Sequence, residues 1–190
     1  MSTVHLRRWT REEYDKMIDV GVLTANDRVE LIEGEIVTVT PQNRPHATAV
    51  QLGAAALRRA FGEGVEVRQQ LPLALGDDSE PEPDVAVVIG LTRDYRDAHP
   101  TTALLILEVA DSSLAFDRTN KARLYARAGI ADYWLVNLVD NVLEVRRFPA
   151  PSPDSPDQWG YAVVEQYRAT DGVAPLDRPA NPIVVAELLP

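Results

Sequence analysis

The chain has 190 residues, of which 45% are hydrophobic and 25% are charged. This length suits one well-buried domain over residues 1–190 rather than two, and the composition is that of a globular protein rather than of a disordered chain. Cysteine is absent, which excludes disulfide frameworks, thiolate metal sites and cysteine nucleophiles and favours a reducing compartment.

The net charge of −10 argues against a nucleic-acid partner, because affinity for a phosphate backbone comes mostly from basic charge. The basic residues are seventeen arginines and only two lysines, Lys16 and Lys121. Arginines gather at 7–8, 58–59, 118–127 and 146–147. A locally basic face on an acidic protein therefore stays open, although arginine richness alone more often reflects genome composition than function.

The N-terminal sequence MSTVHLRRWTREEYD becomes charged before an apolar stretch of signal-peptide length can form. The longest later apolar run, ALLIL at 103–107, is too short to cross a bilayer. We therefore expect a cytoplasmic protein.

The first elements are predicted to be a helix and a β-hairpin. Thr10 followed by Glu13 has the form of a capping box, which predicts a short amphipathic helix over residues 11–20 that ends at a glycine. The stretch RVELIEGEIVTVT at 28–40 places apolar and β-branched residues on both sides of Gly34. This pattern indicates a hairpin.

A helix and three strands are predicted next. Apolar residues recur at helical spacing from 46 to 61, and glycines end the run. The following strands are predicted at 65–75, 83–89 and 103–110. The first alternates like a half-exposed strand, whereas the other two are nearly continuous apolar runs, typical of strands buried on both faces. We therefore place the second and third strands centrally.

The remaining elements complete an α/β pattern. Asp117 is predicted to open a helix that runs to Ala128, and a hairpin over 132–148 turns at Asp140 and Asn141. A Pro-rich loop, a late strand and a short terminal element are predicted at 149–157, 160–169 and 183–189, respectively. The order favours an α/β (α+β) sandwich in which helices flank a central mixed sheet, with the first hairpin as an N-terminal extension.

Glu108 is the most informative residue, because it stands near the end of the apolar run ALLILEVA. An ionised carboxylate is costly to bury there without a cation or a hydrogen-bond partner. Strand alternation places Glu108 on the same face as Leu104 and Ile106, at the C-terminal end of a central strand. The alternative is a carboxylate that simply reaches water or an arginine.

A second carboxylate, Asp84, opens the neighbouring apolar strand after the prolines of PEPD. Adjacent strands can bring Asp84 and Glu108 to one edge of the sheet. Hard cations such as Mg²⁺ take oxygen ligands, so two carboxylates and a backbone carbonyl, that of Val109, form a plausible site. The alternative interpretation of PEPD is an ordinary polar turn.

Lys121 is predicted to complete this group. It lies one helical turn before the inward-facing residues Leu124, Tyr125 and Ala128, so it points toward the sheet. In a chain that otherwise uses arginine, a lysine here suggests a need for a compact cation whose pKa can shift. The alternative is a lysine that extends along the surface with its charge in water.

These features together resemble the PD-(D/E)XK nuclease superfamily, with Pro83-Asp84 and Glu108-Val109-Ala110 as its motif. Ala110 stands at the position where the superfamily motif usually has its lysine. The Uma-type restriction-endonuclease branch also lacks a lysine there, and its lysine looks to have moved to the next helix. Four stretches resemble that branch: VELIEGEIV at 29–37, EPDVAVV at 82–88, LILEVADSS at 105–113 and DRTNKARLYARAGIADYWLVN at 117–137. The departures are ADSS after Glu108, where a Ser-Pro-containing turn is usual, and Asn137 in place of Asp.

The resemblance implies a restriction-endonuclease-like fold with its core at about 43–138, and hydrolysis of phosphodiester bonds in DNA. It implies Mg²⁺ or Mn²⁺ held by Asp84, Glu108 and the carbonyl of Val109, with Lys121 and the metal orienting and helping to deprotonate a water. Such nucleases often cut as homodimers. A different reading, favoured by the acidic charge and the displaced lysine, is a catalytically weak or inactive binding or assembly module. A metal-dependent hydrolase of smaller phosphoesters is a third.

The resemblance gives four further residues a lesser place. His46 matches a family position, where it could orient substrate or assist the base, although a contact with the hairpin is the simpler expectation. Glu30 and Glu33 could contact the metal through water, but hairpin carboxylates are more often solvated. Asp117 is expected to act first as a helix cap.

Overall fold

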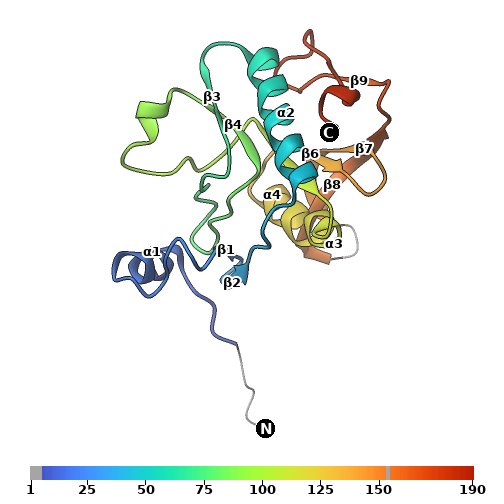
Figure 1. Ribbon diagram of the computed structural model, residues 1–190. Coiled ribbons are helices and arrows are strands. Elements are labelled where there is room, and N and C mark those ends of the chain that lie inside the picture. The colour runs from blue at the N-terminus through green and yellow to red at the C-terminus, as the bar shows by residue number, and fades with distance from the viewer. Residues whose placement is uncertain (1–5, 153–154) are drawn as a thin grey trace.

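A computed structural model describes residues 6–152 and 155–190, with the side chains of 155–157 also left out. A mixed six-stranded sheet forms its centre, in the order β3-β4-β5-β6-β7-β8 (Figure 1). The strands are β3 (Val65–Arg68), β4 (Val85–Ile89), β5 (Leu105–Ala110), β6 (Asp132–Asn137), β7 (Val142–Ser152) and β8 (Ser155–Tyr167). Only β5 and β6 run parallel, and the other neighbours are antiparallel. The predicted mixed sheet is confirmed, with the apolar strands β4 and β5 in its interior.

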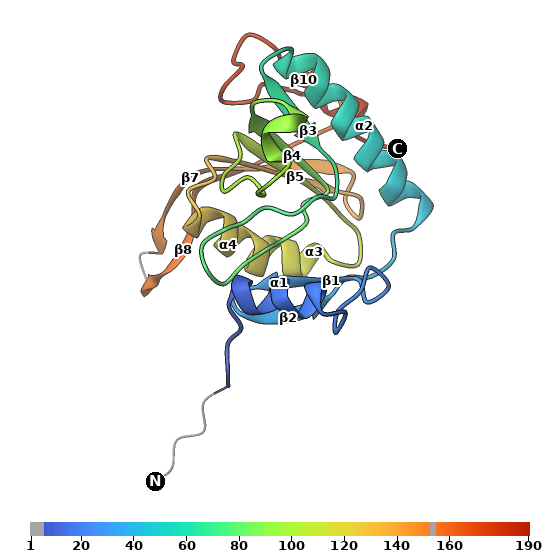
Figure 2. The same ribbon diagram turned by 90° about the vertical axis from the view of Figure 1, so that its left-hand side faces the viewer.

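Helices cover the two faces of this sheet (Figure 2). Helix α2 (Arg44–Phe61) packs on one face against alternate residues of β5, including Leu105, Leu107 and Val109. Helices α3 (Leu114–Phe116) and α4 (Ala122–Arg127) lie on the other face, where Ile106 packs with Leu124 and Tyr125. Because side chains alternate along a strand, Glu108 shares the α4 face with Ile106.

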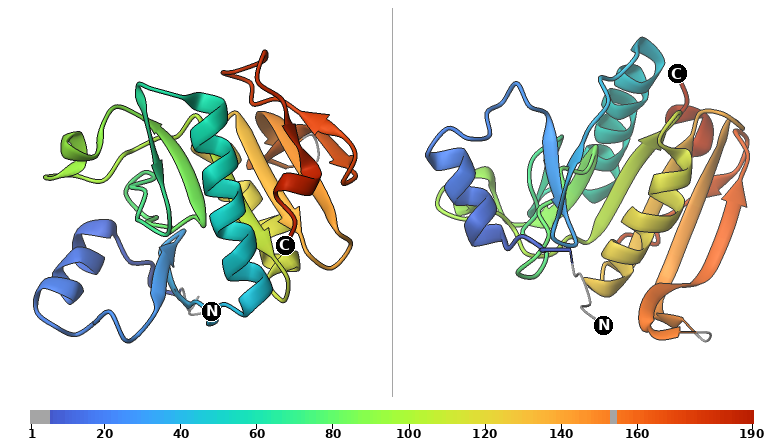
Figure 3. Two further views of the ribbon diagram at one scale, coloured as in Figure 1. Left: turned by 45° about the horizontal axis from the view of Figure 1, so that its top comes forward. Right: turned by 90° about the horizontal axis from the view of Figure 1, so that it is seen from below.

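The N-terminal elements form an extension at one end of the molecule (Figures 2 and 3). Helix α1 (Arg11–Asp19) has the predicted capping box, and β1 (Val29–Ile32) pairs antiparallel with β2 (Glu35–Thr38) as the predicted hairpin. A backbone bridge between Leu31 and Glu80 ties this hairpin to the segment before β4. The hairpin is therefore held beside the edge of the sheet where Asp84 lies.

The C-terminal elements are short. Strands β9 (Gly172–Val173) and β10 (Ile183–Val184) pair with each other, and a 3-10 turn, η3 (Val185–Glu187), follows them. Buried residues of these elements and Leu188 belong to the same hydrophobic cluster as the buried face of α2 (Figure 3). Another 3-10 turn, η1 (Thr92–Tyr95), follows β4. Across the described ranges 6–152 and 155–190, no helix is long and apolar enough to traverse a lipid bilayer.

Two predicted boundaries in the first half of the chain were wrong. Strand β3 ends at Arg68 instead of continuing to 75, because Gln70 has a positive φ of 51° and Leu73 donates its N–H to Pro81 rather than to a strand. Helix α2 begins at Arg44, two residues early, since a proline fits the first turn of a helix.

The second half holds two further corrections. The helix predicted from Asp117 begins at Leu114 and passes through a π-helical segment, η2 (Asp117–Lys121), before α4. Most of the predicted Pro-rich loop at 149–157 is strand, except 153–154, which lie outside the described residues. Beyond Arg147, β7 pairs with β8 alone, and prolines are tolerated on a strand that has one free side.

Candidate active site

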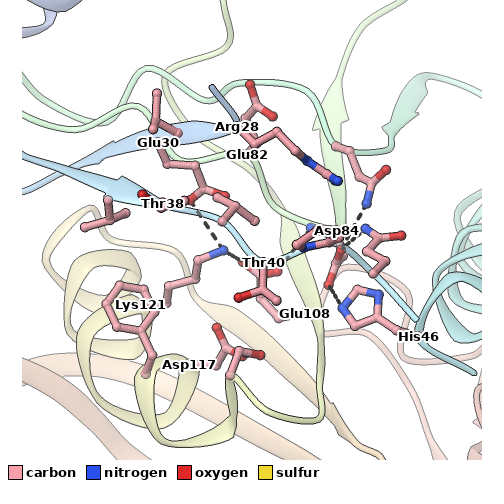
Figure 4. A pocket seen from close by; sticks show the side chains of 18 of the residues that line it. Arg28, Glu30, Thr38, Thr40, His46, Glu82, Asp84, Glu108, Asp117 and Lys121 are labelled. Atoms are coloured by element: carbon pink, nitrogen blue, oxygen red, sulfur yellow. Dashed lines mark hydrogen bonds and ion pairs between the residues drawn. The ribbon is translucent and has the colours of Figure 1, made fainter. Parts of the chain in front are cut away.

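A pocket of about 660 Å³ opens between the end of β5, the first hairpin, the start of α2 and the π-helical segment. Asp84, Glu108 and Lys121 come from three separate elements and face one another at its base, with His46 and Glu30 beside them (Figure 4). The two acids and the lysine are at most 8% exposed. The structure therefore brings Asp84, Glu108 and Lys121 together in one recess.

Asp84 and Glu108 are linked by reciprocal hydrogen bonds across two antiparallel strands. The backbone N–H of Asp84 donates to Oε2 of Glu108 over 3.1 Å, and the N–H of Val109 donates to Oδ2 of Asp84 over 2.9 Å. The start of β4 and the end of β5 meet here because these strands run in opposite directions. Both carboxylates are thus held at one edge of the sheet by backbone groups.

Two donors converge on the other oxygen of Glu108. Oε1 accepts from Nζ of Lys121 at 2.9 Å and from the hydroxyl of Tyr125 at 2.6 Å. Burial raises the pKa of Glu108 to about 8, against the lowering effect of Lys121, and the charge of Asp84 adds to the rise. A carboxylate so placed favours a nearby cation.

Lys121 lies on the buried side of the π-helical segment, and its Nζ is also 3.5 Å from Oε2 of Glu30. Burial opposes its charge, but the surrounding carboxylates, Glu108 and Glu30 first, raise the pKa of Lys121 well above its ordinary value. The lysine therefore stays protonated in this setting.

Asp84 is surrounded by side-chain donors. Its Oδ1 accepts from the amides of Gln42 and Gln70 at 3.4 and 3.3 Å, and Nε2 of His46 is 3.3 Å from Oδ2. Burial disfavours the charged imidazole, but the hydrogen bond and charge of Asp84 outweigh it and raise the pKa of His46. His46 thus faces Asp84.

Three residues for which supporting roles were predicted differ in where the structure places them. Glu30 is only 4% exposed and lies in the pocket, so the expectation of a solvated carboxylate was wrong for it. Glu33 points elsewhere and forms ion pairs with Arg123 and Arg127. Asp117 lines the pocket but is not the N-cap of its helix, because the helix starts earlier and the buried carboxylate accepts from the hydroxyl of Ser113 at 2.6 Å.

Three side chains that contact the site acids were not predicted from the sequence: Tyr125, Gln42 and Gln70. Tyr125 follows Lys121 by four residues on the same helical face, so helical spacing was a usable signal. The two glutamines lie in irregular segments, and no periodicity marks them. Gln70 has a positive φ where the chain turns, and its side-chain amide donates to Asp84.

The charge balance of the pocket base fits a divalent cation. Four acids with at most 8% exposure line it around the single buried ammonium of Lys121; they are Glu30, Asp84, Glu108 and Asp117. Buried negative charge in excess is costly unless a cation offsets it. Among the described residues, no three acidic or histidine side chains gather closely enough to hold a metal by themselves. A metal here would need a backbone carbonyl or water beside the two carboxylates.

Comparison with known proteins places the chain in a family. The family model Uma2, described as "Putative restriction endonuclease", matches residues 11–171. A crystal structure from Anabaena variabilis, titled as "a putative nuclease belonging to DUF820", is similar with a TM-score of 0.70 and 15% identity, and the match covers 94% of this chain and 96% of that one. At this identity the likeness concerns the fold. A search of curated proteins found no match. Since the family model covers most of its length, this chain belongs to the Uma2 family of restriction-endonuclease-like proteins.

Proposed function

We propose that this chain is a Mg²⁺- or Mn²⁺-dependent endonuclease that hydrolyses phosphodiester bonds in DNA. The observation that carries the proposal is the buried excess of carboxylates around one protonated lysine, at the base of an open pocket. Membership of the Uma2 family supports the reaction class. A cytoplasmic location and a homodimer belong to the same proposal.

Asp84, Glu108 and the backbone carbonyl of Val109 would hold the cation. The reciprocal hydrogen bonds between β4 and β5 orient both carboxylates before any ligand arrives. Such a cation supplies charge stabilisation to a phosphoryl oxygen and lowers the pKa of a coordinated water. The protein's own part is to fix the ligands and to keep the recess shaped.

Lys121 and His46 have distinct proposed roles. Because its neighbours keep Lys121 protonated, it would orient a water and stabilise negative charge that develops on the phosphoryl group, rather than remove a proton itself. His46 would orient the carboxylate of Asp84 through Nε2, and it would also contact the substrate. Glu30 and Asp117 would set the local charge around Lys121.

The proposal is tested by cleavage and by metal binding measured on the same preparations. Wild-type protein is incubated with supercoiled, linear and single-stranded DNA and with nucleotides, in Mg²⁺, Mn²⁺ or EDTA. The variants are Asp84→Asn, Glu108→Gln and Lys121→Met, and Asp97→Asn serves as an exposed acidic control, since its side chain is 77% exposed. We expect metal-dependent cleavage of DNA that falls at least 100-fold in the three variants and is unchanged in the control.

Calorimetric titration with Mn²⁺ adds a reading that does not depend on turnover. Asp84→Asn and Glu108→Gln should weaken binding, while circular dichroism shows that each variant is folded. Undiminished cleavage by folded Glu108→Gln would contradict the assignment of Glu108 to the active site. Wild-type protein that binds DNA yet cuts none of these substrates would favour the catalytically inactive binding module. Cleavage of nucleotides but not of DNA would favour the third alternative, a metal-dependent hydrolase of smaller phosphoesters.

A further inference from the structure

The pocket has an apolar side away from the carboxylates. This side comes from the end of α1 and the segment after it, from both strands of the first hairpin and the residues after β2, and from the end of α3; its members include Ile18, Leu23, Val29, Val37, Val39 and Phe116. Ile18 and Val39 are 46% and 36% exposed. A recess that joins a charged base to an exposed apolar wall suits a ligand with both a phosphate and an aromatic ring system.

The charge of the pocket is poorly suited to binding by phosphate contacts alone. Six carboxylates line it, those of Glu30, Glu82, Asp84, Glu108, Asp111 and Asp117. Among arginine and lysine side chains, Arg28 and Lys121 line it, and Lys121 is already paired with Glu108 and Glu30. Electrostatic attraction for a phosphate backbone is therefore weak here, so affinity has to come from contacts with bases.

The depth of the carboxylates restricts the form of the DNA. Glu108 is 3% exposed and Asp84 is 8% exposed, at the bottom of a recess that the hairpin and the residues before α4 flank (Figure 4). A regular duplex presents its phosphates on a stiff cylinder and keeps its bases stacked inside. A flexible single strand can bend a phosphate into the recess and leave a base free for the apolar wall.

We propose that the pocket binds an unpaired stretch of DNA, with a base of that strand against the apolar wall that contains Ile18 and Val39. This inference rests on the proposed function and names the form of its substrate. The phosphate next to that base would then lie over Asp84 and Glu108. A continuous duplex would bind weakly, and its cleavage would require local unpairing.

The chain offers a matched set of variants for the test. The double variant Ile18→Asn/Val39→Asn makes the wall polar. The control Val20→Asn/Val22→Asn changes two valines that are 71% and 65% exposed and do not line the pocket. Binding of fluorescein-labelled ten-nucleotide oligothymidylate and of a blunt hairpin duplex is measured by fluorescence anisotropy in Ca²⁺, and a gel checks that each probe stays intact.

We expect wild-type protein to bind the single strand at least tenfold more tightly than the duplex. The wall variant should lose about tenfold in single-strand affinity, because two apolar side chains that contact the base become polar, while the control pair keeps wild-type affinity. Equal or tighter binding of the duplex, or equal losses in the two double variants, would overturn the inference. Circular dichroism confirms that both variants are folded.

Parallel cleavage assays in Mg²⁺ separate this inference from the proposed function. Faster cleavage of the single strand than of the duplex supports both. Cleavage of the duplex at the same or a greater rate contradicts the inference and leaves the nuclease function standing. Absence of cleavage together with a clear single-strand preference contradicts the nuclease function, whereas the binding inference holds.

Discussion

The two oxygens of Glu108 have different surroundings. Oε1 accepts from both Lys121 and Tyr125, whereas Oε2 accepts one backbone N–H, that of Asp84. A carboxylate oxygen can accept two hydrogen bonds, so Oε2 keeps an acceptor position for a cation. Burial and the charge of Glu108 raise the pKa of Tyr125 well above its ordinary value, so its hydroxyl stays protonated and donates. Tyr125 is therefore a positioning residue for Glu108.

The variant Tyr125→Phe tests this role. Loss of the hydroxyl removes one of the two hydrogen bonds to Oε1, so the carboxylate group of Glu108 is held less firmly in one orientation. Residues that orient metal ligands typically contribute 10- to 100-fold to metal affinity. We expect Mn²⁺ affinity, measured by calorimetry, to fall by about tenfold or more, with a stability loss of about 1 to 3 kcal/mol.

Tyr161→Phe is the matched control, because the hydroxyl of Tyr161 donates to the carbonyl of Ile130 at 2.9 Å and does not contact the pocket residues described above. It should lower stability to a similar degree without changing Mn²⁺ affinity. Equal Mn²⁺ affinity in wild-type protein and folded Tyr125→Phe would show that Lys121 and the N–H of Asp84 are sufficient to orient Glu108.

At the level of elements, the contact between α2 and β5 determines how the end of β5 is held. Gly53 is buried in α2, and a Cβ at this position would lie 3.2 Å from the side chain of Leu107. That distance is tighter than ordinary van der Waals contact. The helix therefore rests on the residue that directly precedes Glu108.

The variant Gly53→Val is expected to separate α2 from β5. The larger side chain overpacks a dense interface, which typically costs about 1 to 3 kcal/mol. Ala55→Val is the control, since Ala55 lies on the exposed side of the same helix. This substitution has only the small destabilising effect of a β-branched residue in a helix. Urea unfolding measures both free energies, and equal values for the two variants would contradict the predicted close packing.

The π-helical segment is the second element that builds the site. It carries both Asp117 and Lys121 on its buried side, between α3 and α4. A π segment holds an extra residue per turn, which changes the facing of side chains relative to a regular helix and often occurs at functional sites. The regular helix predicted from Asp117 had the correct inward face for Lys121, but it could not anticipate this local widening.

At the level of the whole molecule, buried carboxyl groups make stability depend on pH. Burial is the main cause that raises the pKa of Glu108 to about 8 and that of Glu80 to about 7, from an ordinary 4.5. In the folded protein these groups keep protons that the unfolded chain releases above pH 4.5. Their contribution is therefore complete below about pH 4.5 and is lost as the pH rises through 7 and 8.

We expect the melting temperature in EDTA to fall between pH 5 and pH 8, by about 2 to 4 °C for each kcal/mol lost in a chain of this size. Millimolar Mg²⁺ should restore stability most at the high end, because a cation binds the deprotonated carboxylates. Glu108→Gln should flatten the dependence. A melting temperature in EDTA that rises over this range would contradict the assigned burial of these acids.

Much of the fold follows from local patterns. The capping box before α1, the glycine turn of the first hairpin and the apolar runs of β4 and β5 each depend on near neighbours in the chain, and the structure confirms all of them. The predicted end of β3 was wrong because Gln70 and Leu73 donate their N–H groups to Pro83 and Pro81 in another segment. Tertiary contacts decide such boundaries, because they outweigh the small preferences of single residues.

The sequence alone determined the types of the main elements, the family resemblance and the expectation that Asp84, Glu108 and Lys121 carry the chemistry. Only the tertiary structure decided that Glu30 enters the pocket while Glu33 leaves it, and that Tyr125 and two glutamines complete the surroundings of the acids. The reason is physical: spacing along one strand or helix predicts which face a residue occupies. Which distant side chain meets it depends on how the whole chain packs.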